Sequence, residues 1–181
     1  MRKLHGVSPR LEARVTGVLY LFSILLGVAA MTLIGRKMQA QGDQLVLVAG
    51  ALYTGLTVLL WDLFRPVNLW VSTGAAVFSL TGCWFPQSWF KSANITNFLF
   101  FGVYCLLVGY LILRSRFFPH AVGVLMVCAG VCWMTSSWPL LDHALSPYTT
   151  IAGLVGEGTF MGYLLLRGLD EQRWREQAKL A

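Results

Sequence analysis

Six runs of mostly apolar residues, each about 20 residues long, are separated along the chain by short polar stretches. They cover residues 15–34, 44–64, 67–85, 95–113, 120–138 and 148–166. Within a run the apolar residues are continuous, as at 45–60, instead of alternating with polar ones, so helices are favoured over strands. A helix of about 20 apolar residues crosses the roughly 30 Å of hydrocarbon in a bilayer. The pattern therefore predicts an all-α integral membrane protein, a bundle of six transmembrane helices.

The polar stretches predict three parts: a basic N-terminal tail at 1–14, a six-helix transmembrane domain at 15–166 and a charged C-terminal tail at 167–181. We expect the last tail to continue the sixth helix beyond the membrane. A cleaved signal peptide is the alternative for the first run, since Val28, Ala29 and Ala30 are small residues that suit a cleavage site. The run continues past that point to Ile34, which favours a retained span.

Composition excludes two classes of protein. The chain has 181 residues, of which 56% are hydrophobic and 12% charged, whereas about a quarter of an ordinary soluble domain is charged. With 7 Trp, 11 Phe and 6 Tyr, the chain also has far more apolar surface to bury than a disordered segment carries. The lipid bilayer is therefore the expected partner of most of its surface.

The basic residues predict the orientation of the chain. Six spans place both tails on one side of the membrane, and 11 of the 14 Lys and Arg residues fall on that side. The other three are Arg36, Lys37 and Lys91. Because basic residues near span ends stay cytoplasmic, both termini are predicted to be cytoplasmic. The net charge of +6 follows from this topology and from the anionic inner leaflet, so nucleic acid is not an expected partner.

Tryptophans gather near the predicted membrane boundaries, which is typical of interfacial aromatic belts. Trp61 and Trp70 lie near the inner boundary, and Trp84, Trp89 and Trp138 lie near the outer one. A ligand cage is the alternative interpretation of these rings.

No metal or cofactor is predicted. Four cysteines fall inside predicted spans and are interpreted as packing residues. Cys128 and Cys132 are four apart and share a helix face, so a metal site or a redox pair is the alternative. Haem ligation would need axial ligands such as His at mid-depth, and none of the three His residues lies there.

Glu157 is the main candidate for a functional residue. It lies nine residues after Tyr148 in the sixth run, close to the middle of the bilayer at about 1.5 Å per residue. A polar side chain at that depth is costly and marks a candidate site. No Lys, Arg or His is expected at the same depth, so a neutral acid that hydrogen-bonds across helices is predicted.

Counting to the same depth in the other runs gives the neighbours expected for Glu157. Tyr53, Ser79 and Tyr104 are the further ligand-binding candidates, since their hydroxyls can bond to a carboxyl group. Gly158 and Gly162 form a small-xxx-small pair that is expected to let another helix approach. Two interpretations remain open. In one, the helices cross tightly and Glu157 makes a single polar contact between them; in the other, Glu157 lines a cavity.

Asp62 is the other acid inside a run. It lies at the cytoplasmic end with Arg65 three residues later, and we expect the two to form an ion pair on one helix surface. A role in admitting protons is the alternative for Asp62.

Several motifs, in this order, resemble the bacterial membrane family named domain of unknown function 4386. They are Arg14-Val-Thr-Gly-Val-Leu-Tyr20, Arg65-Pro-Val-Asn68, Phe101-Gly-Val-Tyr-Cys-Leu-Leu-Val-Gly-Tyr110, Arg114-Ser115 with Phe118-Pro119 and Gly123-Val-Leu, and Gly156-Glu157. The resemblance extends from about Leu11 to Gly168. It implies a six-span protein of the bacterial cytoplasmic (inner) membrane with no established activity.

The same resemblance bears on the candidate site. The family pattern has an acid at the position of Glu157, an Arg at the position of Ser79 and a His at the position of Tyr104. This sequence keeps the acid and departs at the other two positions. Any chemistry that the family shares through these three positions is therefore in doubt for this chain.

The sequence contains no complete catalytic motif, so an enzymatic activity is left open. The first hypothesis is a bundle that binds a lipid-like or other apolar small molecule in a cavity near Glu157. The second is a non-catalytic accessory or scaffold subunit of a membrane complex, or a homo-oligomer. The third is a membrane enzyme or a proton-coupled transporter in which Glu157 exchanges a proton.

Overall fold

Helices make up most of the residues that the computed structural model describes, which are 8–85 and 97–180, and no strand occurs among them. Trp89, Lys91 and the first seven residues of the predicted tail at 1–14 lie outside them. Within the described residues the helices are α1 (Pro9–Gly35), α2 (Gln39–Phe64), α3 (Leu69–Trp84), α4 (Asn97–Arg114), α5 (His120–Thr135), α6 (Pro139–Leu145), α7 (Tyr148–Leu166) and α8 (Glu171–Leu180). The predicted all-α fold is confirmed.

Several helices have the length and composition of membrane spans. In the described part of the chain α1, α2, α4 and α7 are long and apolar enough to cross a bilayer, and α5 with α6 adds a fifth candidate if this pair is one span. That pair is bent by 118°. The apolar helix α3 has 16 residues and is about 24 Å long, less than the hydrocarbon thickness. These helices indicate a multi-pass membrane protein, and the count of six spans stays a prediction.

Local sequence signals explain where the helices begin. Ser8 caps α1, because its Oγ accepts a hydrogen bond from the Leu11 amide at 3.2 Å. Asn68 caps α3 in the same way, with its Oδ1 3.0 Å from the Val71 amide. Pro139 begins α6, where its missing amide proton is not needed.

The C-terminal tail does not continue α7, so that prediction is wrong. Helix α7 ends at Leu166, and Gly168 takes a φ of 70°, a left-handed conformation that favours glycine. The separate helix α8 then packs against the ends of other helices. The Trp174 indole donates to the Leu63 carbonyl at 2.9 Å, and the Arg116 amide donates to the Gln177 side chain at 3.1 Å.

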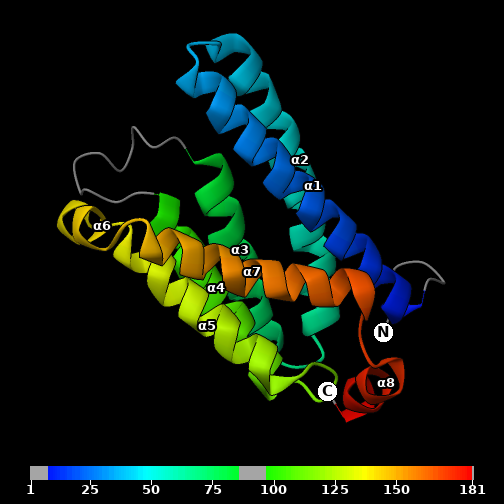
Figure 1. Ribbon diagram of the computed structural model, residues 1–181. Helices are drawn as coiled ribbons and strands as arrows, with labels where there is room; N and C mark the ends of the chain where they lie inside the picture. The colour runs from blue at the N-terminus through cyan, green and yellow to red at the C-terminus, as the bar shows by residue number, and fades with distance from the viewer. Residues whose placement is uncertain (1–7, 86–96, 181) are drawn as a thin grey trace.

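The long helices pack as two hairpins joined by the other two helices (Figure 1). Helices α1 and α2 form one hairpin, and α4 and α5 form the other. Helix α7 contacts both α1 and α5, while α3 contacts both α2 and α4. Side chains from all six of these helices therefore meet in one core.

Candidate functional site

Glu157 is held in the core by donors from three other helices. Its side chain belongs to α7, and the residue is 2% exposed. Tyr20 of α1 donates from its hydroxyl to Oε2 at 2.9 Å. Trp133 of α5 donates from its indole nitrogen to Oε1, and the Cys105 thiol of α4 lies 3.9 Å from the same oxygen. Both carboxyl oxygens therefore have a partner, and each of these partners is neutral.

Two glycines of α7 allow these donors to reach the acid. A Cβ at Gly156 would lie 2.5 Å from the Leu125 carbonyl oxygen, and one at Gly153 would lie 2.8 Å from the Trp133 ring. The absence of side chains at these positions lets α5 approach α7 closely enough for Trp133 to bond to Glu157.

The prediction that another helix approaches closely at Gly158 and Gly162 is wrong. A Cβ at either position would meet nothing within 4 Å. Each residue advances a helix by about 100°, so Gly158 lies about 200° around α7 from Gly156, on the opposite face. The glycine spacing indicated a packed face, but the packed face belongs to Gly153 and Gly156.

Tyr53 and Tyr104, two of the predicted candidates, lie next to this acid site. The ring of Tyr53 is 6.5 Å from that of Tyr20 and 6.2 Å from that of Tyr104, measured between centroids. Both hydroxyls are buried, and neither makes a hydrogen bond of ordinary geometry. The hydroxyl that bonds to Glu157 is that of Tyr20, while Tyr53 and Tyr104 stay candidates for binding.

Ser79, the remaining candidate, is buried between α3 and α2. Its Oγ lies 2.8 Å from the Thr57 Oγ, and Thr57 also donates to the Tyr53 carbonyl at 2.8 Å. The six helices of the core thus each contribute at least one polar side chain to a group that we call the polar centre. Its members are Tyr20, Tyr53, Thr57, Ser79, Tyr104, Cys105, Trp133 and Glu157.

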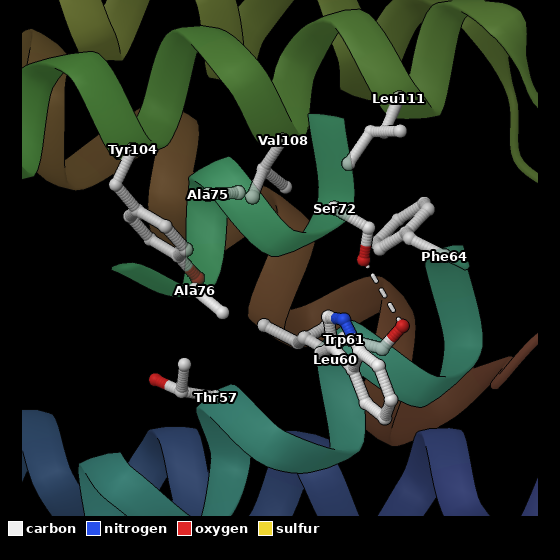
Figure 2. Close-up of a pocket in the computed structure, with 10 residues that line it drawn as sticks. All are labelled: Thr57, Leu60, Trp61, Phe64, Ser72, Ala75, Ala76, Tyr104, Val108 and Leu111. Carbon is white, nitrogen blue, oxygen red and sulfur yellow. Dashed lines mark hydrogen bonds between the residues drawn. The ribbon is translucent and has the colours of Figure 1, made fainter. Parts of the chain in front are cut away.

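A narrow crevice adjoins the polar centre between α2, α3 and α4. It has a volume of about 10 Å³ and is mostly apolar. Figure 2 shows Tyr104 and Thr57 at one end of it and Phe64 with Leu111 at the other. Ser72, at the second end, donates to the Trp61 carbonyl at 3.0 Å. The residues that line the crevice therefore extend from members of the polar centre to the ends of α2 and α4 and the beginning of α3.

The second buried acid lies at the end of α2, and its predicted ion pair is confirmed. Arg65 Nε is 2.8 Å from Asp62 Oδ1, and the guanidinium lies 5.5 Å from the centre of the Trp61 ring. No ion pair among the described residues includes Glu157.

Metal and thiol chemistry receives no support from the geometry of the described residues. No three His, Cys, Asp or Glu side chains gather there into a group that could hold a metal ion. Cys128 is exposed and Cys132 half-buried, and all four cysteines are free.

Sequence reasoning missed the three residues that bond to Glu157. In the first run Ser23 also lies near that depth, one turn from Tyr20, but its hydroxyl donates to the Tyr20 carbonyl at 2.9 Å. Trp133 and Cys105 were interpreted only as parts of apolar runs. The available signal was that an indole and a phenol in a span need hydrogen-bond acceptors, and Glu157 was the mid-depth acid.

Comparison with known proteins finds a similar family for part of the chain. Residues 87–168 match the family described as Domain of unknown function (DUF4386), which confirms the predicted resemblance over α4, α5, α6 and α7. This match includes Glu157 and three of its companions in the polar centre, Tyr104, Cys105 and Trp133. No curated protein matches the chain, and no solved structure does.

Proposed function

We propose that this chain is a proton-linked protein of the bacterial inner membrane in which Glu157 takes up and releases a proton inside the helix bundle. The observation that carries the proposal is a carboxyl group with 2% exposure, bonded by Tyr20 and Trp133 and outside every described ion pair. An acid without a cation in hydrocarbon is neutral or strongly bonded, and a change of its charge alters the packing around it.

The proposed topology has six spans with both termini in the cytoplasm. The α5–α6 pair counts as one broken span and the short helix α3 as another. In this arrangement the ends of α2 and α4 and the beginning of α3 lie on the cytoplasmic side, with Asp62 and Arg65 near the lipid head groups. The bent α5–α6 pair supports a membrane process, because broken helices are typical of transporters.

The bonding pattern supports one position for the proton in the proposed function. An indole nitrogen is only a donor, so Oε1, which faces Trp133, acts as the acceptor. A proton on neutral Glu157 therefore lies on Oε2, and the Tyr20 hydroxyl, which donates to Oε2 when the carboxyl group is ionised, turns to accept from it. The proton and the exchangeable hydroxyl then face each other across the 2.9 Å between Oε2 and Tyr20 Oη.

Infrared difference spectroscopy on the protein in liposomes tests this function without a known substrate. We expect a carboxylic acid C=O band that changes as the pH is changed and that is absent in Glu157→Gln. The matched control is Glu176→Gln, at an exposed acid of α8, which leaves the band in place. If the band stays unchanged across the pH range in which the protein is folded, Glu157 does not exchange a proton and has only a structural role.

Binding of an apolar small molecule near Glu157 stays a prediction. The crevice beside Tyr104 is far smaller than the several hundred Å³ of an ordinary ligand pocket, so a lipid-like molecule requires the helices to separate there. The proton-linked function needs no such movement, and it is the function we favour.

A further inference from the structure

Three exposed arginines lie where the beginning of α1 meets the end of α7 (Figure 1). Arg10 and Arg14 are one turn apart on α1, so they share one face of that helix. A Cβ added at Gly168 would lie 3.1 Å from the Arg10 Cγ and 3.6 Å from the Arg14 Cγ. The stems of both arginines therefore pack over the turn that follows α7. Arg167, the residue at the end of α7, comes directly before this glycine.

A hydrogen bond holds Arg14 at the same turn. Its Nη2 donates to the Leu166 carbonyl at 3.4 Å, in the last turn of α7, where carbonyls lack a partner within the helix. A guanidinium group has five N–H donors, so this single bond leaves donors for a ligand. Arg14 is therefore positioned by the protein and can still bind an anion.

No acidic side chain pairs with these arginines in the described part of the chain. None of the ion pairs there includes Arg10, Arg14 or Arg167. Glu12 is two residues from both Arg10 and Arg14, and this spacing places it about 200° around α1, on the opposite face. Its carboxyl group lies against Asp62 of α2 instead. The three arginines thus present positive charge that none of these acids balances.

An exposed apolar stripe on α1 continues from the arginines toward the middle of the predicted span. Its residues recur every three or four positions and are 42–52% exposed: Leu11, Val15, Val18 and Phe22. Arg14 belongs to the same face as Val18, four residues further along. Positive charge at the end of a span with apolar surface beside it matches a phospholipid, which has a phosphate above an acyl chain.

We propose that Arg10, Arg14 and Arg167 bind the phosphate of an anionic phospholipid, with one acyl chain along the apolar stripe of α1. Guanidinium groups bind phosphate oxygens through paired hydrogen bonds. A zwitterionic head group carries a cation of its own, which three arginines without an acid repel. The apolar stripe favours a lipid over free phosphate, because free phosphate has no part that would cover it.

The bound lipid connects two helices that already share a contact in the core. It bridges the beginning of α1 and the end of α7, and the hydrogen bond between Tyr20 and Glu157 joins the same two helices. In the proposed topology this site faces the cytoplasmic leaflet. The inference depends on these helix ends lying at a membrane boundary and does not depend on proton exchange by Glu157.

Binding of phosphatidylglycerol to the full chain in neutral detergent micelles tests the site. Native mass spectrometry gives the affinity as lipid is added, with phosphatidylcholine as the zwitterionic comparison. We expect phosphatidylglycerol to bind more tightly. Arg10→Gln combined with Arg167→Gln should weaken its binding by at least about tenfold, because each arginine near a lipid surface contributes about fivefold. Arg14 is kept in this variant because it bonds to the Leu166 carbonyl.

The matched control combines Arg114→Gln with Arg116→Gln. Both arginines are exposed near the end of α4 and outside the described ion pairs, so the control removes the same charge elsewhere. It should keep the affinity for phosphatidylglycerol. The unfolding temperature in phosphatidylcholine alone should be the same for both variants and the unchanged protein, which shows that a lost affinity does not come from a lost fold.

Three results would overturn the proposal. If the control weakens binding as much as Arg10→Gln with Arg167→Gln, the lipid responds only to net charge. If phosphatidylcholine binds as tightly as phosphatidylglycerol, the arginines do not select an anion. If inorganic phosphate at the same concentration displaces the lipid, the ligand is a free anion. Glu157→Gln should keep the lipid affinity, so a failure of the proposed function leaves this site in place.

Discussion

Two acids are buried in the described part of the chain, and their surroundings differ. Asp62 is 8% exposed at the end of α2, where Arg65 bonds to it from one turn further along. Glu157 is 2% exposed in the middle of α7, where Tyr20, Cys105 and Trp133 reach it from three other helices. Near the helix end a long cationic side chain keeps its charged head close to water while pairing with the acid. In the core, neutral donors supply the hydrogen bonds of the acid instead. Because these donors belong to other helices, their bonds join segments that are distant in the sequence.

The largest difference between the two acids is expected in stability. Glu157→Ala leaves the Trp133 indole and the Tyr20 hydroxyl buried without their acceptor, at about 1–3 kcal/mol for each unsatisfied group. We expect the free energy of unfolding to fall by about 2–4 kcal/mol in total. Glu157→Gln keeps an acceptor for Trp133 and should lose less than about half of that. Thermal unfolding in detergent measures both variants. If Glu157→Ala loses no more stability than the exposed control Glu176→Ala, the hydrogen bonds to Glu157 do not stabilise the protein.

A smaller effect distinguishes the hydroxyls of the polar centre. Tyr20→Phe removes a hydroxyl that bonds to Glu157, and we expect it to destabilise the protein by about 1 kcal/mol. Tyr53→Phe removes a buried hydroxyl without a bond, so the same change of atoms should be neutral or slightly stabilising. The unfolding temperatures of the two variants, measured side by side, give the comparison. Equal losses would show that both hydroxyls serve the network.

The smallest effect is expected at the ion pair. Asp62→Asn removes the charge, but Arg65 is 31% exposed at its side chain and can turn to water or lipid head groups. The loss should be about 0.5 kcal/mol and should shrink further at high salt, because the Arg65 end of the pair is partly exposed and salt screens it. Unfolding at low and high salt measures it. A salt-independent loss as large as that of Glu157→Ala would remove the contrast between the two acids.

The apolar pattern predicted the helices well because burial in lipid selects continuous apolar runs. The run at 148–166 coincides with α7, and the run at 120–138 begins with α5. The predicted run at 120–138 continues through the break at Ser136, Ser137 and Trp138, where α5 has already ended. Pro139, a typical first residue of a helix, begins α6 directly after this break. Helices α1 and α2 begin before their runs because polar residues at 9–14 and 39–43 continue the helix beyond the apolar part.

The candidate site was predicted in part, for a physical reason. Depth in the membrane follows from counting residues, and counting placed Glu157 in the core together with Tyr53, Ser79 and Tyr104. The rotation of each helix and its crossing angle do not follow from counting. Rotation and crossing angle depend on close contacts between helices, such as the one at Gly156. As a result, Tyr20 and Trp133 are the residues that bond to the acid.

The hydrogen bond between Tyr20 and Glu157 also constrains the order of assembly during synthesis. The two residues are 137 positions apart, in the first helix and in the last helix of the core. If the helices enter the membrane in chain order, Tyr20 and Trp133 wait for their acceptor until α7 has been inserted. The core then closes in a single late event, and a chain that stops before α7 would present unpaired donors to cellular quality control.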